Sequence, residues 1–368
     1  MAAPHGQRRI LVSAVEPSGD RLGAELIAAI RTLSGNRAPI RFEGLVGPQM
    51  VAAGAVPVEG AQWAPPVMGG VEVLRHLGAF RRNRAALVAA MDTRPDLYLG
   101  IDAPDFHLGL ARQARARGLR AVGYVSPQLW AWRPGRAPSV AAAYDQLLCL
   151  FSFEPALYAG TTLDARWVGH PVVDRVAPSR REPGVLAVFP GSRPAELSRH
   201  LDLFLDAAAR FGAREVLLAQ APGITLPADP GPKVRIVTGE EALARADRAL
   251  TKSGTVTLEL ALAGVPTVVA HRVHPLTYWI GRLLVHGVKH LALPNVLLRE
   301  EVVPEYVQRF DAATLASRLA AAPEPPRDRL LAMLGPSGAS LRAGAAVLEG
   351  FGAEPPGAAT PPGPRSRR

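Results

Sequence analysis

Covalent cross-links and membrane anchors are what this sequence lacks. Its 368 residues contain a single cysteine, Cys149, so an intramolecular disulfide is excluded and a reducing compartment fits the chain. No uninterrupted apolar run reaches the roughly 18 residues expected of a membrane span. No segment near the start combines basic residues, a sustained apolar stretch and a small-residue cleavage site. We therefore expect a soluble or peripheral protein.

Metal ligands in a recognised spacing are missing as well. The chain has no Asp-x-Asp motif to clamp a metal-bound diphosphate, and the pair His271 and His274 lacks a nearby Cys or Asp. The sequence therefore predicts no metal site and no cofactor. Isolated histidines in apolar strings are usually structural, and we interpret His107, His170 and His271 in that way, although each remains a candidate base.

Positive charge is in excess. Lys and Arg total 42 against 32 Asp and Glu, which gives a net charge of +10 and favours an anionic partner. The arginines are scattered, and no helix-turn-helix, zinc-finger or ribonucleoprotein motif occurs, so we expect no nucleic acid partner. Anionic lipid and phosphorylated sugar are the partner classes that remain.

Length and periodicity predict two α/β domains. A chain of 368 residues exceeds the size at which one core usually stops growing. A strand at 9–14, a turn at 16–20 and a helix at 21–33 open one alternating series, and a strand at 185–189 opens a second. This order is typical of doubly wound parallel sheets. We expect two Rossmann-like domains, at 1–178 and 179–334, a C-terminal helix at 335–352 that packs back on the first, and a disordered tail at 353–368.

One segment concentrates aromatic and charged side chains behind a predicted strand. The strand at 120–125 ends at Ser126, and Trp130 and Trp132 follow with two arginines. Open α/β sheets bind ligands at the carboxyl ends of their strands, where these indoles could stack on a sugar or a base. The alternative interpretation is that both tryptophans are ordinary packing residues and the arginines a solvated rim.

Polar residues lie at the same expected edge of the first sheet. Asp102 ends a strand that begins near residue 96, whereas Asp105 precedes a helix and is interpreted as its cap. The turn after the first strand supplies four further candidates for an acceptor or cleft site: Glu16, Ser18, Gly19 and Asp20. Its amides could meet an anion at the helix start, but Ser18 and Asp20 could instead be N-caps.

The second half has two turns that each join a strand to a helix. They consist of Gly191, Ser192 and Arg193, and of Ser253, Gly254 and Thr255. Amides and hydroxyls in such turns suit a diphosphate, and Arg193 adds a bidentate donor for the charge that builds on a leaving group. Glu259 could accept from a ribose diol or only favour the helix dipole. Asn295 could bind phosphate or uracil or cap a turn.

Taken together, these blocks resemble lipid-A-disaccharide synthase. The matching motifs are Ile101-Asp-Ala-Pro-Asp-Phe106, Tyr124-Val-Ser-Pro127 with Trp130-Ala-Trp132, Phe189-Pro-Gly-Ser-Arg193 with Glu196, Ser253-Gly-Thr255 with Glu259, and Leu293-Pro-Asn295. The resemblance implies the two-domain GT-B glycosyltransferase fold with a cleft between its domains, a catalytic base at Asp102 and a UDP-sugar site that includes Glu196. Val15 and Pro17 depart from the family's first block, where position 15 is usually glycine.

The stretch 67–84 places apolar residues at helical spacing beside arginines. Val73, Leu74, Leu77 and Phe80 recur in this way, as in a helix that lies on an anionic membrane. A helix packed on a core with a solvated charged face has the same pattern. We adopt the membrane interpretation because the resemblance implies an acylated substrate.

A defined reaction follows from the resemblance. It implies inverting, metal-independent transfer of 2,3-diacylglucosamine from its UDP derivative to 2,3-diacylglucosamine 1-phosphate, which yields a β-1,6-linked disaccharide of lipid A biosynthesis and UDP. The alternatives are a UDP-N-acetylglucosamine 2-epimerase and a non-catalytic anionic-lipid-binding relative. We expect a cytoplasmic enzyme, peripheral on the anionic inner membrane, with a homodimer as a further expectation.

Overall fold

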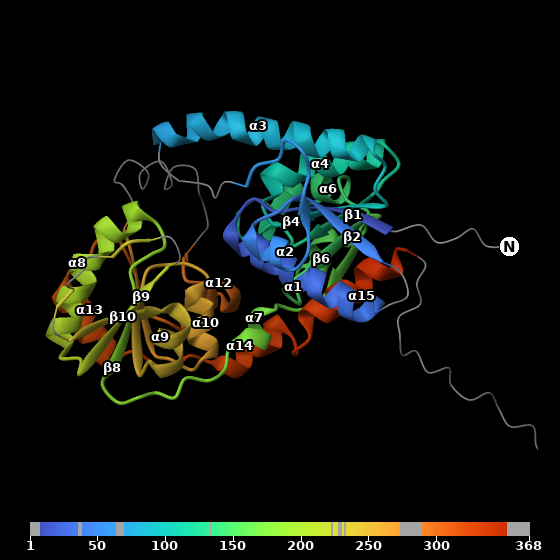
Figure 1. Ribbon diagram of the computed structural model, residues 1–368. Helices are drawn as coiled ribbons and strands as arrows, with labels where there is room; N and C mark the ends of the chain where they lie inside the picture. Colours follow the sequence, from blue (N-terminus) through green and yellow to red (C-terminus); the bar gives the residue numbers. More distant parts are fainter. Residues whose placement is uncertain are drawn as a thin grey trace, which may run out of the picture. The chain divides into compact units, whose positions relative to one another are not determined.

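The computed structural model describes residues 8–35, 39–63, 70–132, 134–221, 224–226, 230–231, 233–272 and 289–351; at 70–77, 131–132 and 134 it describes the backbone only. Two parallel sheets, of seven and six strands, are each flanked by helices (Figure 1). The predicted fold class, two doubly wound α/β domains, is confirmed. The chain divides into two compact units, which are described one at a time.

The first unit comprises the chain up to residue 127, residues 135–170, and the chain from residue 338 onward. Its strands pair in parallel in the order β3-β2-β1-β4-β5-β6-β7. They are β1 (Arg8–Ser13), β2 (Ile40–Leu45), β3 (Val56–Pro57), β4 (Leu97–Ile101), β5 (Arg120–Tyr124), β6 (Gln146–Cys149) and β7 (Asp164–Trp167). The helices are α1 (Pro17–Ser34), α2 (Pro48–Ala52), α3 (Gly70–Asp92), α4 (Pro104–Ala116), α6 (Ala137–Ala141) and α15 (Ala339–Glu349), with a 3₁₀ turn at Pro155–Tyr158; a second 3₁₀ turn, Pro134–Arg136, begins in the other unit.

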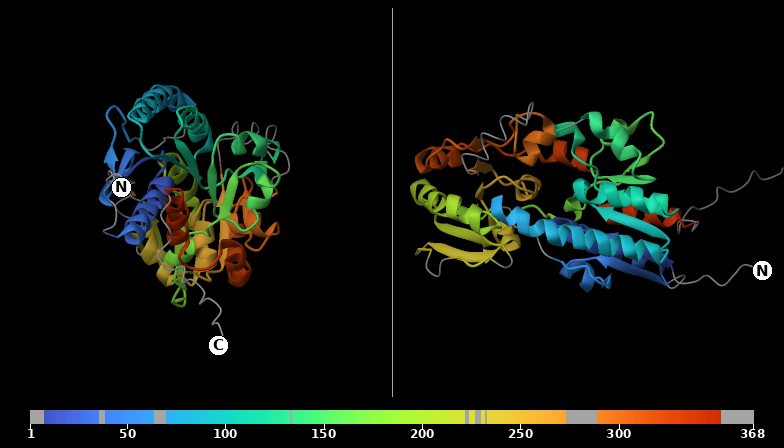
Figure 2. Two further views of the ribbon diagram at one scale, coloured as in Figure 1. Left: turned by 90° about the vertical axis from the view of Figure 1, so that its right-hand side faces the viewer. Right: turned by 90° about the horizontal axis from the view of Figure 1, so that it is seen from above.

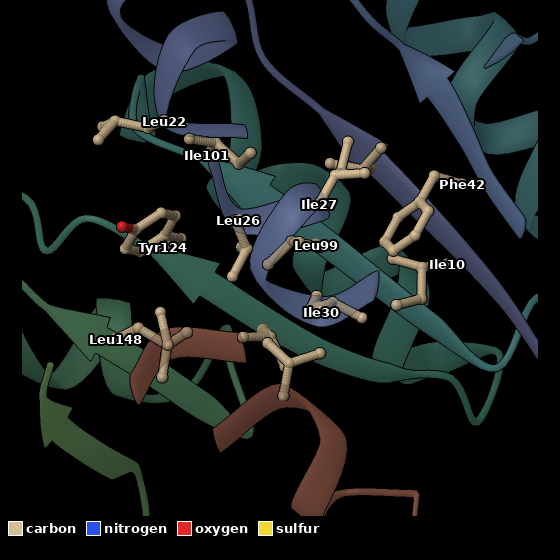
Figure 3. Close-up of a cluster of buried hydrophobic side chains, with 14 of the residues drawn as sticks. Ile10, Leu22, Leu26, Ile27, Ile30, Phe42, Leu99, Ile101, Tyr124 and Leu148 are labelled. Atoms are coloured by element: carbon tan, nitrogen blue, oxygen red, sulfur yellow. The ribbon is translucent and has the colours of Figure 1, made fainter. Parts of the chain in front are cut away.

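Alternate strand residues build the main core of this unit. Ile10 pairs with Leu97 in the parallel register, and its side chain lies on the face that receives Leu26 and Ile30 from α1 (Figure 3). All four side chains are fully buried. Burying such a side chain is worth about 1.5–3 kcal/mol, so the apolar stripe of α1 fixes which face of the sheet the helix covers.

The last described helix, α15, shares this face with α1 (Figures 1 and 2). Contact is close because Gly344 has no side chain: a Cβ there would lie 3.3 Å from the backbone nitrogen of Ile30. Ala343 and Val347 complete the contact and are fully buried. The C-terminal helix therefore belongs to the first unit.

Helices α3 and α4 belong to the opposite side of the sheet. In the second half of α3 the side chains of Leu87 and Met91 are fully buried. His107 of α4 lies over Gly100, where a Cβ would be 3.0 Å from the imidazole. The Nδ1 atom of His107 is 2.7 Å from the Tyr98 hydroxyl, and both residues are fully buried. Burial lowers the pKa of His107 to about 3, so the imidazole is neutral in the folded protein.

The second unit comprises residues 128–134 and 171–337. Its strands pair in parallel in the order β10-β9-β8-β11-β12-β13. They are β8 (Val185–Phe189), β9 (Glu215–Gln220), β10 (Val234–Thr238), β11 (Arg248–Thr251), β12 (Thr267–His271) and β13 (Glu305–Val307). The helices are α5 (Leu129–Trp132), α7 (Val172–Arg175), α8 (Pro194–Phe211), α9 (Gly239–Arg245), α10 (Val256–Leu262), α12 (Leu293–Leu298), α13 (Ala312–Ala320) and α14 (Arg327–Leu334).

Helices α8 and α13 bury one face of this sheet. Phe204 of α8 and Leu315 of α13 are fully buried against Val188 and Leu250, which lie on the neighbouring strands β8 and β11. In both units the strand order reverses beside the first strand, at β1/β4 and at β8/β11. Ligands of such sheets bind at the carboxyl edge of this reversal point.

The start of α1 differs from the sequence prediction. The helix begins at Pro17, so Ser18 and Asp20 lie inside its first turn, and its N-terminus has no side-chain cap. The alternative interpretation of both residues as N-caps is therefore wrong for this helix. The buried carboxylate of Asp20 instead accepts from the backbone amides of Gln49 (2.9 Å) and Met50 (3.1 Å) at the start of α2. Asp20 caps the neighbouring helix because α1 packs beside it.

None of the helices in the described part of the chain is long and apolar enough to cross a membrane.

The neutral state of His107 predicts acid sensitivity of the first unit. The unfolded imidazole takes up a proton near pH 6.5 but the folded one only near pH 3, so stability is complete above pH 6.5 and falls as the pH decreases below it. Between pH 7 and pH 5 we expect His107 alone to remove about 2 kcal/mol. Urea unfolding of His107→Gln should show a correspondingly weaker pH dependence, and an unchanged dependence would contradict this assignment.

Candidate active site

The turn that follows β8 requires glycine. Gly191 has φ of 134°, and a Cβ there would lie 2.5 Å from the Cβ of Glu196 and 2.7 Å from its Oε2. The turn therefore wraps closely around the Glu196 side chain, which projects from the first turn of α8. This places Gly191 and Ser192 at the carboxyl end of β8, as the sequence predicted.

Glu196 is the residue that holds this turn. Its Oε2 accepts from the Ser192 amide at 2.9 Å, and its Oε1 lies 2.9 Å from the Lys252 ammonium and 3.5 Å from Arg193 Nη1. Burial favours a neutral carboxyl, but the hydrogen bond and charge of Lys252, the Ser192 amide and the charge of Arg193 together outweigh it, and the pKa of Glu196 is lowered. The Ser192 amide is thus already bonded within the protein.

Arg193 is more exposed than Lys252, the other cation that contacts Glu196. It is the N-cap residue of α8, with an extended backbone, and its side chain is 36% exposed. Its 3.5 Å distance to Glu196 Oε1 is longer than that of a strong ion pair, so the planar guanidinium can reach an incoming anion. This is the position at which the sequence predicted a bidentate donor.

The turn after β11 lies next to the turn after β8, because β8 and β11 are neighbours. The Ser253 hydroxyl donates to the carbonyl of Leu291 at 2.9 Å, Thr255 is exposed at the start of α10, and the position of a Gly254 Cβ is 3.9 Å from the Lys252 nitrogen. The two predicted turns are therefore adjacent in the structure, and Lys252 lies beside both of them.

Glu259 and Asn295 differ in exposure and in how many hydrogen bonds their side chains make within the protein. Glu259 lies in the first turn of α10 and is 3.9 Å from Arg175, and its side chain is partly exposed. Asn295 is fully buried: its Oδ1 accepts from the amides of Val302 and Val303, and its amide group donates to the carbonyl of Val303. The structure thus shows Asn295 in a turn-stabilising role, and its assignment to phosphate or uracil stays a prediction.

The sequence pattern alone did not connect Lys252 or His200 with the turn after β8. Lys252 directly precedes the Ser253 block, and its position after a strand was the available signal. His200 packs 6.0 Å from His271 between ring centroids, accepts from the Arg272 amide and bonds the carbonyl of Glu196 through Nδ1. Burial lowers the pKa of both histidines, that of His271 to about 4. Both rings are neutral at pH 7, so they add no charge to this site.

In the first unit, Asp102 sits on a strained backbone at the carboxyl end of β4. Asp102 and Ala103 have φ of 55° and 41°, and Val125, which follows the neighbouring strand β5, has φ of 81°. Such values cost on the order of 1–3 kcal/mol each in residues with a side chain. The Asp102 amide donates to the carbonyl of Tyr124 (2.8 Å) and the Val125 amide to that of Leu148 (3.0 Å), which hold the two turns. Strain of this kind concentrates at functional sites.

The two aspartates of this region have different surroundings. Asp102 is half-buried, and burial raises its pKa from the ordinary value of an aspartate, which suits a proton acceptor. Asp105 is the second residue of α4, whose N-cap is Ala103, and no side chain caps that helix. The Asp105 carboxylate is 88% exposed and lies 3.4 Å from Arg136. The predicted capping role of Asp105 is therefore wrong.

The aromatic segment is divided between the units. The buried Ser126 hydroxyl is 2.9 Å from that of Tyr158 in the first unit. Trp130 is half-buried, and Trp132 is the last residue of α5, with a side chain outside the described ones; both tryptophans belong to the second unit.

The remaining candidates from the first unit have simple placements. Glu16 is the N-cap position of α1, and Ser18 is exposed in its first turn. Gly19 is buried in the same turn, where a Cβ would lie 3.3 Å from that of Ala14. Among the described residues, no three His, Cys, Asp or Glu side chains are arranged to hold a metal ion.

The predicted membrane helix is described only in part. Val73, Leu74 and Leu77 lie in α3, but their side chains are outside the described ones. Phe80 is 38% exposed and meets Phe106 of α4 edge-on, with 4.8 Å between ring centroids. Phe80 therefore contributes to packing within the unit.

Comparison with known proteins decides the family. The family model described as Lipid-A-disaccharide synthetase matches residues 10–322. Lipid-A-disaccharide synthase from Alkalilimnicola ehrlichii is 40% identical over 340 residues, which cover 83% of this chain and 86% of that protein. The chain belongs to the lipid-A-disaccharide synthase family.

Solved structures show that the fold is shared more widely than the sequence. The calicheamicin glycosyltransferase CalG4 superposes with a TM-score of 0.59 at 19% identity, covering 94% of this chain and 98% of that one. A putative UDP-N-acetylglucosamine 2-epimerase from Listeria monocytogenes gives 0.58 at 10% identity, covering 94% and 97%. At these identities the likeness concerns the fold alone, and it confirms the GT-B fold.

The departures from the lipid-A-disaccharide synthase pattern in the first block are accommodated by the backbone. Val15 is outside the positive-φ region, so this position does not require glycine. Pro17 is the first residue of α1, where a missing amide hydrogen costs nothing and the fixed φ favours the helix. These two substitutions therefore leave the turn intact.

The close contact at Gly191 predicts that a Gly→Ala change lowers the free energy of unfolding more at Gly191 than at Gly254. Gly191→Ala adds a methyl group at a left-handed position against Glu196, and we expect a loss of about 1–3 kcal/mol from backbone strain alone. In Gly254→Ala the nearest atom to the new methyl group is Lys252 Cε at 3.6 Å, an ordinary contact, so stability should change little. Urea unfolding of both variants measures this, and equal stability would refute the described turn.

Proposed function

We propose that the protein transfers 2,3-diacylglucosamine from its UDP derivative to the 6-hydroxyl of 2,3-diacylglucosamine 1-phosphate, with inversion, to give a β-1,6-linked disaccharide 1-phosphate and UDP in lipid A biosynthesis. Membership of the lipid-A-disaccharide synthase family carries the proposal. The paired turns at the reversal point of the second sheet, which carry Arg193 and Lys252, support it.

Asp102 is the proposed general base. A primary hydroxyl is a poor nucleophile at neutral pH, so a carboxylate must accept its proton as the glycosidic bond forms. The raised pKa of Asp102, caused by burial, makes it a better acceptor than an exposed aspartate. Its strained backbone supports a functional position in preference to a structural one.

The leaving UDP is stabilised, in this proposal, by the protein's own cations. Arg193 presents a partly exposed guanidinium at the start of α8, where the helix dipole also favours negative charge. Ser192, Gly191, Ser253, Gly254 and Thr255 line the two neighbouring turns, and Glu259 is the proposed partner of the ribose hydroxyls. On this basis we propose that turnover requires no metal ion.

The alternatives are less well supported. The GT-B fold is common to this chain and to the Listeria epimerase, but at 10% identity that likeness does not extend to activity. A non-catalytic anionic-lipid-binding relative would have no reason to keep Asp102, Arg193 and Glu259 together in one chain.

The setting of the reaction is also a proposal. Acylated sugars reside in a membrane, and a net charge of +10 favours an anionic surface, so we propose that the enzyme works peripherally on the cytoplasmic face of the inner membrane. Because Phe80 packs on Phe106, a vesicle-binding test should change Leu74 and Leu77 and leave Phe80 in place.

A homodimer stays a prediction, which sedimentation of the purified protein would test.

The activity test is product analysis. Purified protein is incubated with UDP-2,3-diacylglucosamine and 2,3-diacylglucosamine 1-phosphate, with and without EDTA, and the products are identified by mass. We expect the tetraacyl disaccharide 1-phosphate in both samples. Loss of product in EDTA, restored by magnesium, would refute metal independence, and an epimerised UDP-sugar as the only product would favour the epimerase alternative.

Asp102→Asn should remove most turnover. The change keeps the shape but removes the proton acceptor, so we expect a loss of roughly 10²- to 10⁴-fold in kcat with UDP binding retained. The acid limb of the wild-type pH–rate profile should lie above the usual range of an exposed aspartate, because burial raises the Asp102 pKa.

Asp105→Asn is the matched control. Its exposed carboxylate makes one long ion pair, worth less than about 1 kcal/mol, so both stability and turnover should stay close to wild type. A larger catalytic loss in Asp105→Asn than in Asp102→Asn would move the base to Asp105.

Arg193→Ala should impair the departure of UDP. Removing one preorganised charge stabiliser typically costs about 10²- to 10³-fold in kcat. Arg193→Lys should restore only part of the loss, since the planar fork is absent. Steady-state kinetics measures both, and full activity of folded Arg193→Ala would exclude it from the reaction.

A further inference from the structure

Lysine is rare in this chain, and one of its lysines is placed differently from the others. Only three of the 42 basic residues are lysines: Lys233, Lys252 and Lys289. Lys233 and Lys289 are exposed, whereas the Lys252 side chain is 17% exposed and ends on a carboxylate. Lysine side chains are rarely buried unless they pair with an opposite charge, as Lys252 does with Glu196.

The Lys252 ammonium joins two turns of the second unit. Its nitrogen lies 2.9 Å from Glu196 Oε1 in the first turn of α8, and its backbone amide donates to the carbonyl of Phe189 at 3.0 Å. Its Cε and Nζ also lie against Gly254, at 3.6 and 3.9 Å from where a Cβ would be. Lys252 thus connects the turn after β11 to the turn after β8.

The link continues from Glu196 to the backbone. Glu196 Oε2 accepts from the Ser192 amide at 2.9 Å, and Gly191 passes so close to this carboxylate that no side chain fits there. The Glu196 carboxylate therefore contacts the turn at both Gly191 and Ser192.

Glu196 depends on Lys252 for its charge. The Glu196 side chain is 12% exposed, and burial by itself would favour the neutral form. Arg193 is the other cation near it, but at 3.5 Å, and Arg193 must be available to the substrate in the proposed reaction. Removing one partner of a buried ion pair leaves the other charge uncompensated and is strongly destabilising to its surroundings.

We propose that Lys252 is a positioning residue of the diphosphate site: its ammonium fixes the Glu196 carboxylate, which fixes the Ser192 amide and so the turn that presents Arg193. This inference rests on the proposed function for the identity of the ligand. Lys252 acts through Glu196 and makes no bond to the phosphates. Arg193, with its greater exposure, is left to bind them.

Hydrogen exchange tests, without any substrate, whether Lys252 holds the Ser192 amide through Glu196. In full-length Lys252→Met, amides in the peptide that spans residues 190–197 should exchange faster than in wild type, because the acceptor of the Ser192 amide is no longer held. Lys233→Met removes the same charge from an exposed position of the same unit and should leave this peptide unchanged. Unchanged exchange in folded Lys252→Met overturns the proposal. If Lys252→Met does not fold, Lys252→Ala, which also removes the donor to Glu196, replaces it with the same expected result.

A double-mutant cycle on UDP affinity separates positioning from direct binding. Lys252→Met and Glu196→Gln should each weaken UDP binding by roughly 10- to 100-fold, the range for losing a hydrogen bond to a charged group. The double variant should be no weaker than either single one, since both changes break the same link. Lys252→Arg should recover most of the affinity.

The outcomes are distinguishable. If Lys252→Met weakens UDP binding further in the Glu196→Gln background, Lys252 contacts the phosphates directly and the positioning role is wrong. If wild-type protein binds no UDP, the proposed function fails, while the hydrogen-exchange comparison still decides the link from Lys252 to the Ser192 amide.

Discussion

Parallel pairing of the strands is the constraint on which the site depends. A parallel strand must be followed by a crossover, and in each sheet the crossovers lead away to both sides of the first strand. The loops that follow β1 and β4, and those that follow β8 and β11, therefore diverge at one edge. Every residue proposed for catalysis or diphosphate binding comes from these loops or from the first turn of the helix behind them.

The polar residues predicted for the site divide into two groups by how their polar atoms are used. Asp20 and Asn295 are buried, and their oxygens accept from backbone amides of α2 and of residues 302–303. Asp102 and Arg193 are only partly buried and keep capacity for a ligand. The first group shapes the loops, and the second is available for chemistry. Glu196 is intermediate, because its carboxylate organises both a backbone amide and two cations.

Backbone strain lies at the candidate site of the first unit, directly at the ends of two neighbouring strands. Three non-glycine residues at adjacent strand ends, Asp102, Ala103 and Val125, have positive φ. Amide bonds to Tyr124 and Leu148 hold these conformations, and the fully buried strands beneath supply the rigidity. A carboxylate on such a support is oriented before its substrate arrives, which is the condition for efficient proton transfer.

The sequence by itself determined the fold class and the order of strands and turns. The strand at 185–189 was predicted with its observed bounds, and the turns at Gly191 and Ser253 fell at strand ends as expected, because alternation and turn residues are local signals. Tertiary structure alone decided what the polar side chains do. Asp20 caps α2 instead of α1, Asp105 does not cap α4, and Lys252 reaches Glu196 from 56 residues away. Such partners are set by how elements pack, and no local pattern specifies them.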